Sequence, residues 1–405
     1  MKLLGALSFC VVVSNVCAFE SDDFLDRLDA ALTMSAFHDS LRARLSGTIE
    51  LEDYHFQQPA PALIDSKDDN LLNLRLTLFL DAQVGPRIYF FAQARLDRGF
   101  DPSGRGANLR LDEYALRITP WDDGRFTVQI GKFATVVGNW VPRHLAWENP
   151  FVNAPLVYEN VTAINDRVAP ASALDFFRRY QGAKYELNPV IWGPSYASGL
   201  SISGRLGQFD YAAEMKNSSL SSRPESWDVT EVGFNDPTFN ARLGFRPNQM
   251  WNFGLSASDG AYLRPEAERT LPPGRDFGDF RELLLGQDVS FAWHHLQLWA
   301  EFYEARFEIP TVGDADTFAY YFEAKYKFTP QLFGAVRWNQ ELFNRVNNGA
   351  GGRVPWSQDL GRIDIAAGYR FTSHTQLKLQ YSFQKETSAP RNDNHTLAAQ
   401  FTVRF

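Results

Sequence analysis

Cysteine is almost absent from this chain of 405 residues, which contains only Cys10 and Cys17. Both lie within residues 1–18, where a basic second residue, an apolar run over residues 3–13 and a final Ala18 are typical of a secretory signal peptide. We therefore expect cleavage after Ala18 and a mature chain without cysteine. Such a chain has no disulfide, no thiolate nucleophile and no cysteine-ligated metal.

Long apolar runs are missing as well. The run near the N-terminus has about a dozen residues, fewer than the roughly 20 that a transmembrane helix needs. No run of about 18 apolar residues follows it, so we expect no membrane-spanning helix. A lipid anchor on Cys17 is the alternative reading of the N-terminus. Residues 14–16 disfavour it because they lack the small residue expected beside a lipidated cysteine.

The chain also lacks a net positive charge and the common motifs of metal and phosphate sites. The formal net charge of -8 argues against nucleic acid as a partner. His294 and His295 are adjacent but have no carboxylate at ligand spacing, so we expect no metal site. Neither Lys-Ser/Thr nor a helix follows the glycine-rich residues 349–352, so we expect no phosphate cradle and no cofactor.

A catalytic group is not evident either. The other histidines are scattered over tail, turn and loop positions: His38, His55, His144, His374 and His395. An outer-membrane enzyme would need a Ser/His or Asp/His group at the rim of its barrel. We therefore expect no catalytic residue and no enzyme, with an enzyme barrel as the rival class.

Aromatic residues and alternating strands are what the chain has in abundance. Aromatic residues make up 14% of it, and in residues 41–52 apolar or small side chains at odd positions alternate with Arg, Ser, Thr and Glu at even ones. In lipid every backbone polar group must be paired within the protein, so only helices and closed barrels can span it. A barrel with a watery lumen shows this apolar-out, polar-in alternation.

The alternation continues to the last residue and predicts about 16 strands. Short turns alternate with long connections, as in barrels whose turns face the periplasm. We therefore predict an all-β, transmembrane, antiparallel up-and-down β-barrel over residues 41–405; a soluble β-sandwich is the alternative. The expected strands are 41–52, 72–81, 88–96, 114–118, 126–130, 200–206, 209–215, 239–245, 251–257, 289–293, 296–302, 318–326, 332–338, 363–371, 377–383 and 397–405.

Two stretches fall outside the alternation. In residues 19–40, apolar side chains from Phe24 to Leu32 share one face of a helix, which predicts a short periplasmic helix before the barrel. Residues 134–198 form by far the longest connection.

The segment before that connection, Gln129-Ile130-Gly131-Lys132-Phe133-Ala134-Thr135-Val136-Val137-Gly138, resembles the strand-into-loop segment of the phosphate-selective porin superfamily. The resemblance implies a sixteen-stranded outer-membrane porin, usually a homotrimer, whose long loop folds into the lumen as a constriction. The loop residues that this implies at the constriction are Trp140, Arg143, His144, Arg167, Arg178 and Arg179.

The C-terminus also resembles Gram-negative outer-membrane proteins, because an alternating strand ends there in Phe405. Such an edge strand can pair with a barrel assembly machinery. The expected partners are therefore that machinery, outer-membrane lipid and lipopolysaccharide, small ions and solutes, and further copies of the chain.

Strand parity predicts which charged residues face the lumen. With the loop arginines, the expected pore-lining residues are Arg42, Arg75, Arg95, Arg117, Arg205, Arg242, Lys325, Arg337 and Arg362. Rings of Arg and Lys favour anions, although interleaved carboxylates depart from the resemblance and could pair with them instead. We expect a passive porin for small hydrophilic solutes with weak anion preference. A sugar or nutrient channel that uses lumen aromatics, and a barrel plugged by its loop, are the alternatives.

Overall fold

The protein is described by a computed structural model that covers residues 23–38, 40–57, 63, 69–97, 108–179, 187–224, 233–387 and 393–405. The residues of the expected signal peptide lie outside this part. No helix among the described residues is long and apolar enough to cross a membrane.

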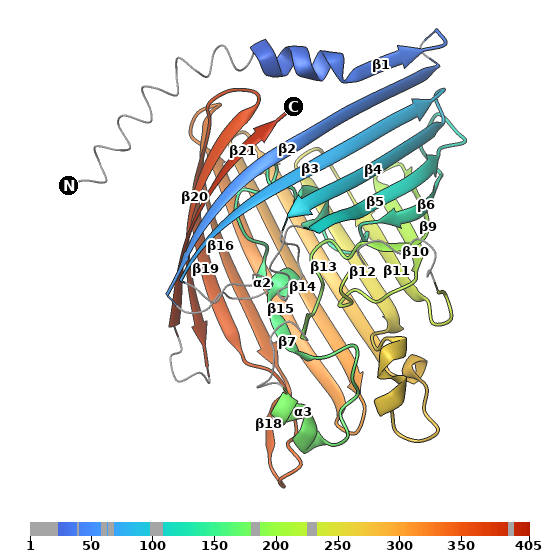
Figure 1. The fold of residues 1–405 in the computed structure, drawn as a ribbon, viewed down its shortest axis with the longest axis vertical. Helices are drawn as coiled ribbons and strands as arrows, with labels where there is room; N and C mark the ends of the chain where they lie inside the picture. Colours follow the sequence, from blue (N-terminus) through green and yellow to red (C-terminus); the bar gives the residue numbers. More distant parts are fainter. Residues whose placement is uncertain are drawn as a thin grey trace, which may run out of the picture.

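Sixteen antiparallel strands close into a barrel, as the alternation predicted (Figure 1). The last strand pairs with the first from Thr48↔Arg404 to Phe56↔Thr396, which leaves no open sheet edge along that seam. The strands are β2 (Leu41–Phe56), β3 (Asn70–Val84), β4 (Ile88–Asp97), β5 (Asn108–Ile118), β6 (Thr127–Phe133), β9 (Ala197–Leu206), β10 (Phe209–Lys216), β11 (Thr238–Phe245), β12 (Trp251–Ala261), β13 (Arg281–Trp293), β14 (Leu296–Ile309), β15 (Gly313–Lys327), β16 (Leu332–Phe343), β19 (Leu360–Arg370), β20 (Thr375–Glu386) and β21 (Asp393–Arg404).

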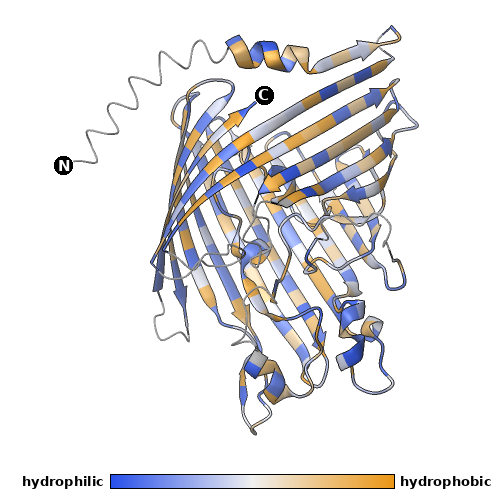
Figure 2. Cartoon of the chain, in the orientation of Figure 1, coloured by the Kyte–Doolittle hydropathy of each residue, from blue (hydrophilic) through white to orange (hydrophobic). Residues whose placement is uncertain are grey.

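The barrel has apolar residues on its outer face and charged residues on its inner face, which is the reverse of a soluble protein. In β16 Val336 and Trp338 lie on the exposed outer face, whereas Arg337, Asn339 and Glu341 face inward and are buried. Figure 2 shows the resulting checkerboard of polar and apolar residues along the strands. An apolar exterior around a charged interior suits lipid outside and water inside, and it is the reverse of a β-sandwich.

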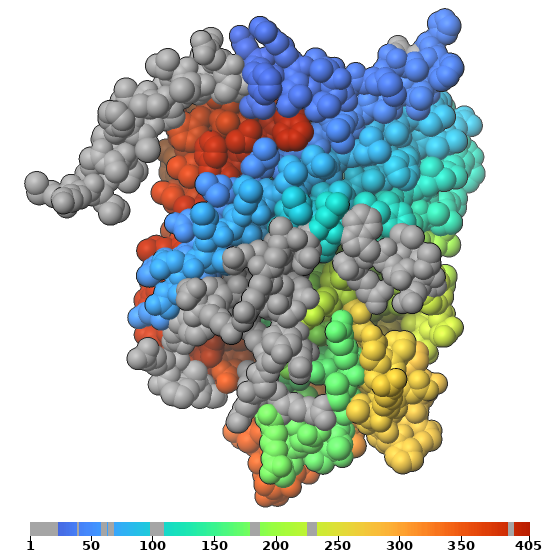
Figure 3. Space-filling model, in the orientation of Figure 1, coloured from blue at the N-terminus to red at the C-terminus, as the bar shows by residue number. Residues whose placement is uncertain are grey.

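The two ends of the barrel differ in their connections. At one end, which we call the turn end, tight turns include Gly85 and Gly207, both with φ near +60°, where glycine carries no steric penalty. At the other, the loop end, long connections carry α3 (Ala173–Arg179), η3 (Pro265–Thr270) and the hairpin of β17 (Arg345–Asn347) and β18 (Arg353–Pro355). These segments gather side by side at the loop end in Figure 3.

Several strands begin earlier than the alternation predicted, such as β5 at 108 and β15 at 313, and β13 differs most. β13 starts at Arg281 rather than 289, because three successive leucines interrupt the apolar–polar pattern. The middle one, Leu284, faces inward and is fully buried in the main apolar cluster, together with loop residues such as Val190 and Ile191. The pattern fails where a loop rather than water covers the inner wall.

The N-terminal segment is only partly helical. Residues 23–31 form a helix across the turn end (Figure 1), but β1 (Thr33–Ala36) is a strand within the stretch predicted to be helical. It pairs with the start of β2, from Thr33↔Arg44 to Ala36↔Leu41, at positions that β21 does not reach. The exposed edge of β2 captures this segment, since unpaired strand edges attract further strands.

Candidate functional site

Among the described residues of the long connection between β6 and β9, those from 137 to 164 contact the inner wall of the barrel, whereas α3 lies at the loop end. The connection contains η1 (Val141–Arg143), α2 (Leu156–Glu159), β7 (Val161–Ile164), α3 and β8 (Asn188–Pro189), and we call residues 134–196 the inner loop. Lys216 ties the two ends of this loop together, because its Nζ donates to the carbonyl oxygens of Phe133 at 2.5 Å and Ala197 at 3.3 Å. The loop therefore enters and leaves at one place on the wall.

Glu301 on β14 is the first anchor on the far side. Its buried carboxylate accepts hydrogen bonds from the backbone N–H groups of Asn139 and Trp140 and from the hydroxyl of Tyr158 at 2.7 Å. Gly138 has a φ of +79°, and a Cβ there would lie 2.2 Å from the Tyr303 hydroxyl. Only glycine lets the loop approach this wall so closely.

Arg143 is held by β15 and β14. Its guanidinium pairs with Glu323, donates to the Tyr321 hydroxyl at 3.1 Å and lies 4.3 Å from the centre of the Trp299 ring. Only 12% of the Arg143 side chain is exposed. The arginine expected to face passing anions is therefore largely neutralised by the wall.

Two arginines of the wall hold the middle of the loop. Arg337 pairs with Asp364 at 2.9 Å and donates to Asn153 Oδ1 at 2.7 Å. Arg362 pairs with Asp364 at 3.0 Å and with Glu159 of α2 at 2.5 Å. Both guanidinium groups are buried, so they act as fixed anchors and not as groups on an open ion path.

Lys378 on β20 is the anchor nearest the turn end. Its buried Nζ donates to the carbonyl oxygens of Ala146, Asn149 and Phe151 at 2.8, 3.0 and 3.0 Å. An ammonium has three N–H donors, and here each finds an acceptor on the loop.

The wall from β2 to β5 carries paired charges of its own. Arg75 contacts Glu50, Glu52 and Asp97 at 2.9–3.0 Å, and Arg95 lies 3.2 Å from Asp112. These predicted pore-lining arginines face inward but are neutralised by neighbouring strands. Arg242 is likewise paired, with Asp288 at 2.8 Å and Asp210 at 3.2 Å.

His144 connects the loop to this wall region. Its Nδ1 lies 2.6 Å from the Val141 carbonyl oxygen and its Nε2 lies 2.7 Å from the Tyr196 hydroxyl, which also accepts from Gln93 at 3.2 Å. Burial, aided by the nearby Arg95, lowers the pKa of His144 to about 4. The imidazole is therefore neutral at pH 7, and this pattern assigns its proton to Nδ1.

The turn end of the lumen has a different charge balance. Arg117 contacts Gln129 and lies over the rings of Tyr89 and Phe91, and Lys325 lies 4.4 Å from the ring centre of Phe333. Most of these cations meet amides, carbonyls or rings rather than carboxylates. Inward positions there carry Arg42, Arg44, Arg117, Arg205, Arg246, Lys325, Arg370 and Arg404, against Asp81 and Asp210. Arg44 pairs with Asp29 of the N-terminal helix at 2.8 Å, so it adds little to this excess.

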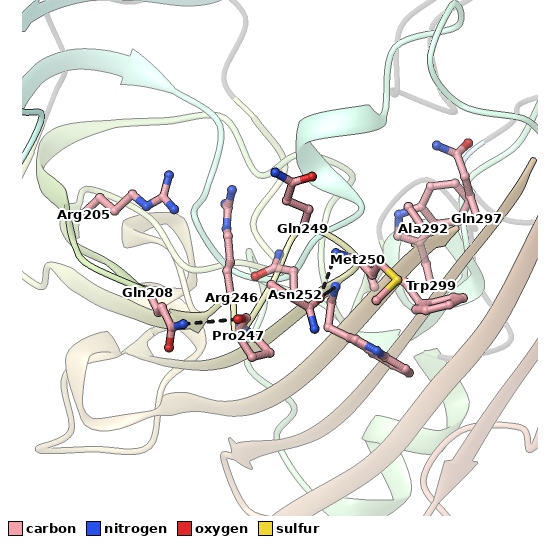
Figure 4. Close-up of a pocket in the computed structure, with 14 residues that line it drawn as sticks. Arg205, Gln208, Arg246, Pro247, Gln249, Met250, Asn252, Ala292, Gln297 and Trp299 are labelled. Carbon is pink, nitrogen blue, oxygen red and sulfur yellow. Dashed lines mark hydrogen bonds between the residues drawn. The ribbon is translucent and has the colours of Figure 1, made fainter. Parts of the chain in front are cut away.

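A chamber of about 660 Å³ opens at the turn end, beside the turns at residues 208 and 246–250. Figure 4 shows the Arg205, Arg246 and Gln249 side chains rising into the same space, with Trp299 and Gln297 at its other side. Its lining residues come from β9, from β12 to β14 and from the turns at residues 208 and 246–250.

The structure does not bring the four loop arginines together. Arg143 lies at the wall, whereas Arg167 and Arg178 are exposed in the part of the loop that reaches the loop end. That part is tied to the outer connections, for example by the Arg264–Asp166 pair at 2.9 Å. The backbone of Arg179 ends α3, and its side chain lies outside the described part.

Strand parity could not find the loop partners that complete these anchors. Tyr158, Asn153 and Asn139 lie in a segment without periodicity, where nothing in the sequence predicts which wall residue each contacts. Among the described residues, no group of three His, Asp or Glu side chains could hold a metal ion.

Comparison with known proteins gives a fold but no sequence relative. No family model matches the chain, and no curated protein matches it significantly. One similar solved structure is OmpT of Vibrio cholerae in a trimer form, with a TM-score of 0.56 and 10% identity over 90% of this chain and 100% of that one. A second is the anion-selective porin from Comamonas acidovorans, with a TM-score of 0.53 and 12% identity over 90% of this chain and 100% of that one. A third is the outer membrane channel DcaP of Acinetobacter baumannii, with a TM-score of 0.56 and 10% identity over 92% of this chain and 100% of that one.

These likenesses extend over nine-tenths of the chain at identities near 10%, so they concern the course of the backbone. They agree with the closed order of the strands. In its fold, the chain is a sixteen-stranded barrel of the outer-membrane porin type.

Proposed function

We propose that this chain is an outer-membrane porin through which small hydrophilic solutes diffuse passively, with a weak preference for anions. The observation that carries the proposal is the wall itself: an apolar exterior encloses a charged interior that is narrowed, over part of its section, by the inner loop. Many of the inward charges hold the inner loop or pair along the wall, and the arginines of the turn end that face rings and carbonyl oxygens remain to interact with a solute.

The anion preference rests on the turn end rather than on the inner loop. In the middle of the barrel Arg75, Arg242 and Arg337 each contact carboxylates, so their charges largely cancel. At the turn end, Arg370 and Arg404 lie 4.8 and 4.2 Å from the ring centre of Trp147. Cations lining a confined aqueous path attract anions more strongly than they would in bulk water.

A planar-bilayer recording tests the proposal. Purified protein should produce discrete conductance steps. In a salt gradient, the sign of the reversal potential should show that anions permeate more readily than cations. Replacing Arg370 and Arg404 by Ala should move that potential toward cations, because it removes two cations from the path. The matched control is R167A/R178A, which removes two exposed arginines at the loop end and should change selectivity much less. Absence of steps from folded protein would refute the channel, and a cation-selective wild type would refute the anion preference.

We propose no catalytic role. His144 inside the barrel contacts a tyrosine and a backbone carbonyl rather than a serine or a carboxylate. His374 contacts Asp26 at 2.9 Å, but its other ring nitrogen faces the Arg404 carbonyl oxygen and no nucleophile.

The proposed setting is the outer membrane, reached by export with a cleaved signal peptide. We also propose a homotrimer that contacts lipid and lipopolysaccharide, and recognition of the strand ending in Phe405 by the barrel assembly machinery. The support for the trimer is the likeness to a structure described as a trimer form, and the support for membrane placement is the exposed apolar exterior. Chemical cross-linking in intact membranes tests the trimer. We expect cross-linked species of two and three copies and none that is larger.

A further inference from the structure

We propose that the chamber at the turn end is a binding site for small hydroxylated monocarboxylates, the chemical class of the sugar acids. This inference rests on the proposed channel function, because such a solute would occupy the chamber on its way through the lumen. The argument uses the charges, the polar groups and the aromatic ring that converge there.

Two guanidinium groups give the chamber its positive charge. Arg205 and Arg246 project side by side into it (Figure 4). Arg205 donates through Nε to the Gly207 carbonyl oxygen at 3.1 Å, and among the described residues no carboxylate lies within ion-pair distance of it. Its other N–H groups are therefore available to a carboxylate, which a guanidinium can bind through two parallel hydrogen bonds.

The charge balance favours a single negative charge on the ligand. Arg246 lies 3.1 Å from Asp210, and its side chain is still 49% exposed. Two arginines and one aspartate leave a net charge of +1 beside the chamber. Arg242 on β11 forms ion pairs with Asp288 and Asp210, so it adds no further net charge.

Glycines in the wall keep these carboxylates folded back from the cavity. A Cβ on Gly244 would lie 2.3 Å from Asp210 Oδ1, and one on Gly254 would lie 2.1 Å from Asp288 Oδ2. The carboxylates occupy the space that larger residues would fill. As a result these two carboxylates do not occupy the chamber, and Arg205 and the exposed part of Arg246 remain open to a solute.

Neutral polar groups supply the contacts that hydroxyl groups need. Asn252 Oδ1 is buried, lines the chamber and has no hydrogen-bond partner among the described residues. Leaving such an acceptor unsatisfied is costly, by about 1–3 kcal/mol, so it favours a ligand with a hydroxyl donor. Ser290, the register partner of Asn252, and the amides of Gln249 and Gln297 line the same space.

Trp299 adds an apolar surface between these groups. Trp299 lies on β14 and lines the chamber. The Arg143 guanidinium of the inner loop lies 4.3 Å from the centre of its ring, and this contact holds the ring in place. A chamber of about 660 Å³ with an aromatic ring and a few converging polar groups is typical of a small-molecule site. A simple inorganic anion would use the arginines but leave Trp299 and Asn252 without a role.

The test is isothermal titration calorimetry on the full barrel in detergent at constant ionic strength. The probes are sodium D-glucuronate, uncharged D-glucose and sodium acetate, each titrated separately. Glucuronate should bind saturably and at least tenfold more tightly than either of the others, because only it carries both the charge and the hydroxyl groups.

Variants assign the binding to the chamber. R205A/R246A should weaken glucuronate binding at least tenfold, and N252A should weaken it several-fold while acetate is unaffected. R167A/R178A, the control with the same change in net charge, should bind as the wild type does. The heat-dependent shift of each variant in denaturing gels checks that it is folded, and N252A tests the site independently of the arginines.

The outcomes separate this inference from the channel proposal. A barrel that conducts but binds glucuronate no better than glucose or acetate overturns the inference and leaves the channel standing. Binding that is unchanged in both chamber variants overturns it as well. Chamber-dependent glucuronate binding by a barrel that does not conduct supports the site and refutes the channel.

Discussion

Lys378 illustrates how single residues of the wall position the inner loop. A buried ammonium is unfavourable unless its donors are satisfied, and each donor here reaches a carbonyl oxygen of residues 146–151. Glu301 does the opposite, accepting from two backbone N–H groups and a tyrosine hydroxyl. Charged side chains thus replace the backbone pairing that an irregular loop cannot provide for itself.

We predict that K378M loosens the loop without preventing folding. Three carbonyl oxygens lose their donor, and an unsatisfied buried acceptor costs about 1–3 kcal/mol unless water replaces the partner. Single-channel recordings should show larger or more variable conductance than the wild type. The control is K385M, which changes an exposed lysine of the same strand. Identical traces for both variants would show that the loop keeps its position without this anchor.

At the scale of elements, the inner loop depends on a neutral histidine. With the pKa of His144 lowered to about 4 by burial, the docked loop does not take up a proton at that ring until the solution is strongly acidic. A released loop would regain an ordinary histidine pKa near 6.5. The contribution of His144 to docking is therefore complete above about pH 6.5 and decreases as the pH falls toward 4.

This predicts an acid-sensitive conductance. Between pH 6.5 and 4 the wild type should show increasing transitions to other conductance levels, because a protonated Nε2 can no longer accept from Tyr196. H144Q keeps a hydrogen-bonding side chain but cannot titrate, so it should lack this part of the response. Since both proteins share every carboxylate, an equal acid response in H144Q would contradict the role of this histidine.

The closing strand is the second element with a testable role. Gly47 and Phe405 exchange two backbone hydrogen bonds, of 2.9 and 3.0 Å, and a Cβ on Gly47 would lie 2.7 Å from the Phe405 ring. The small residue on β2 thus makes room for the terminal ring, and β1 continues the pairing of β2 beyond that point.

We predict that deleting Phe405, or changing it to Asp, lowers the yield of folded barrel in membranes. The deletion removes the last backbone hydrogen bonds of the seam, and Asp replaces the ring that packs over Gly47 by a charge. G47L should act in the same direction by obstructing the ring. F328D is the control, since Phe328 is an aromatic residue at the turn end with 61% of its surface exposed. Normal accumulation of folded protein without Phe405 would show that closure does not depend on it.

At the scale of the whole molecule, closure makes the barrel a single cooperative unit. Every strand of the barrel pairs with two neighbours, and the inner loop ties the walls of β10, β14, β16 and β20 together. No strand can leave without exposing unpaired backbone groups, which are especially costly in lipid.

We therefore predict that the mature protein migrates differently in denaturing gels before and after boiling, and that its circular dichroism in detergent is dominated by β structure. The compact, unboiled form should persist because detergent at room temperature does not open the closed ladder. A helix-rich spectrum, or identical migration with and without boiling, would contradict the closed barrel.

The sequence by itself determined the architecture, because the alternation of side chains between two faces is a local property of each strand. It predicted about sixteen strands and which residues face inward, such as Arg75, Arg337 and Arg362. It missed β1 and the early start of β13, where an available strand edge and the covering loop override local pattern.

Only the tertiary structure decided which inward charges pair and which remain open to a solute. Strand parity predicts that Arg205 and Arg337 both face the lumen. In the structure Arg337 is buried against Asp364 and the inner loop, whereas Arg205 projects into the chamber. The difference depends on where the described residues of the inner loop, 134–179 and 187–196, lie across the lumen. That path is fixed by contacts between residues more than 100 positions apart, such as Trp140 with Glu301, which no local pattern encodes.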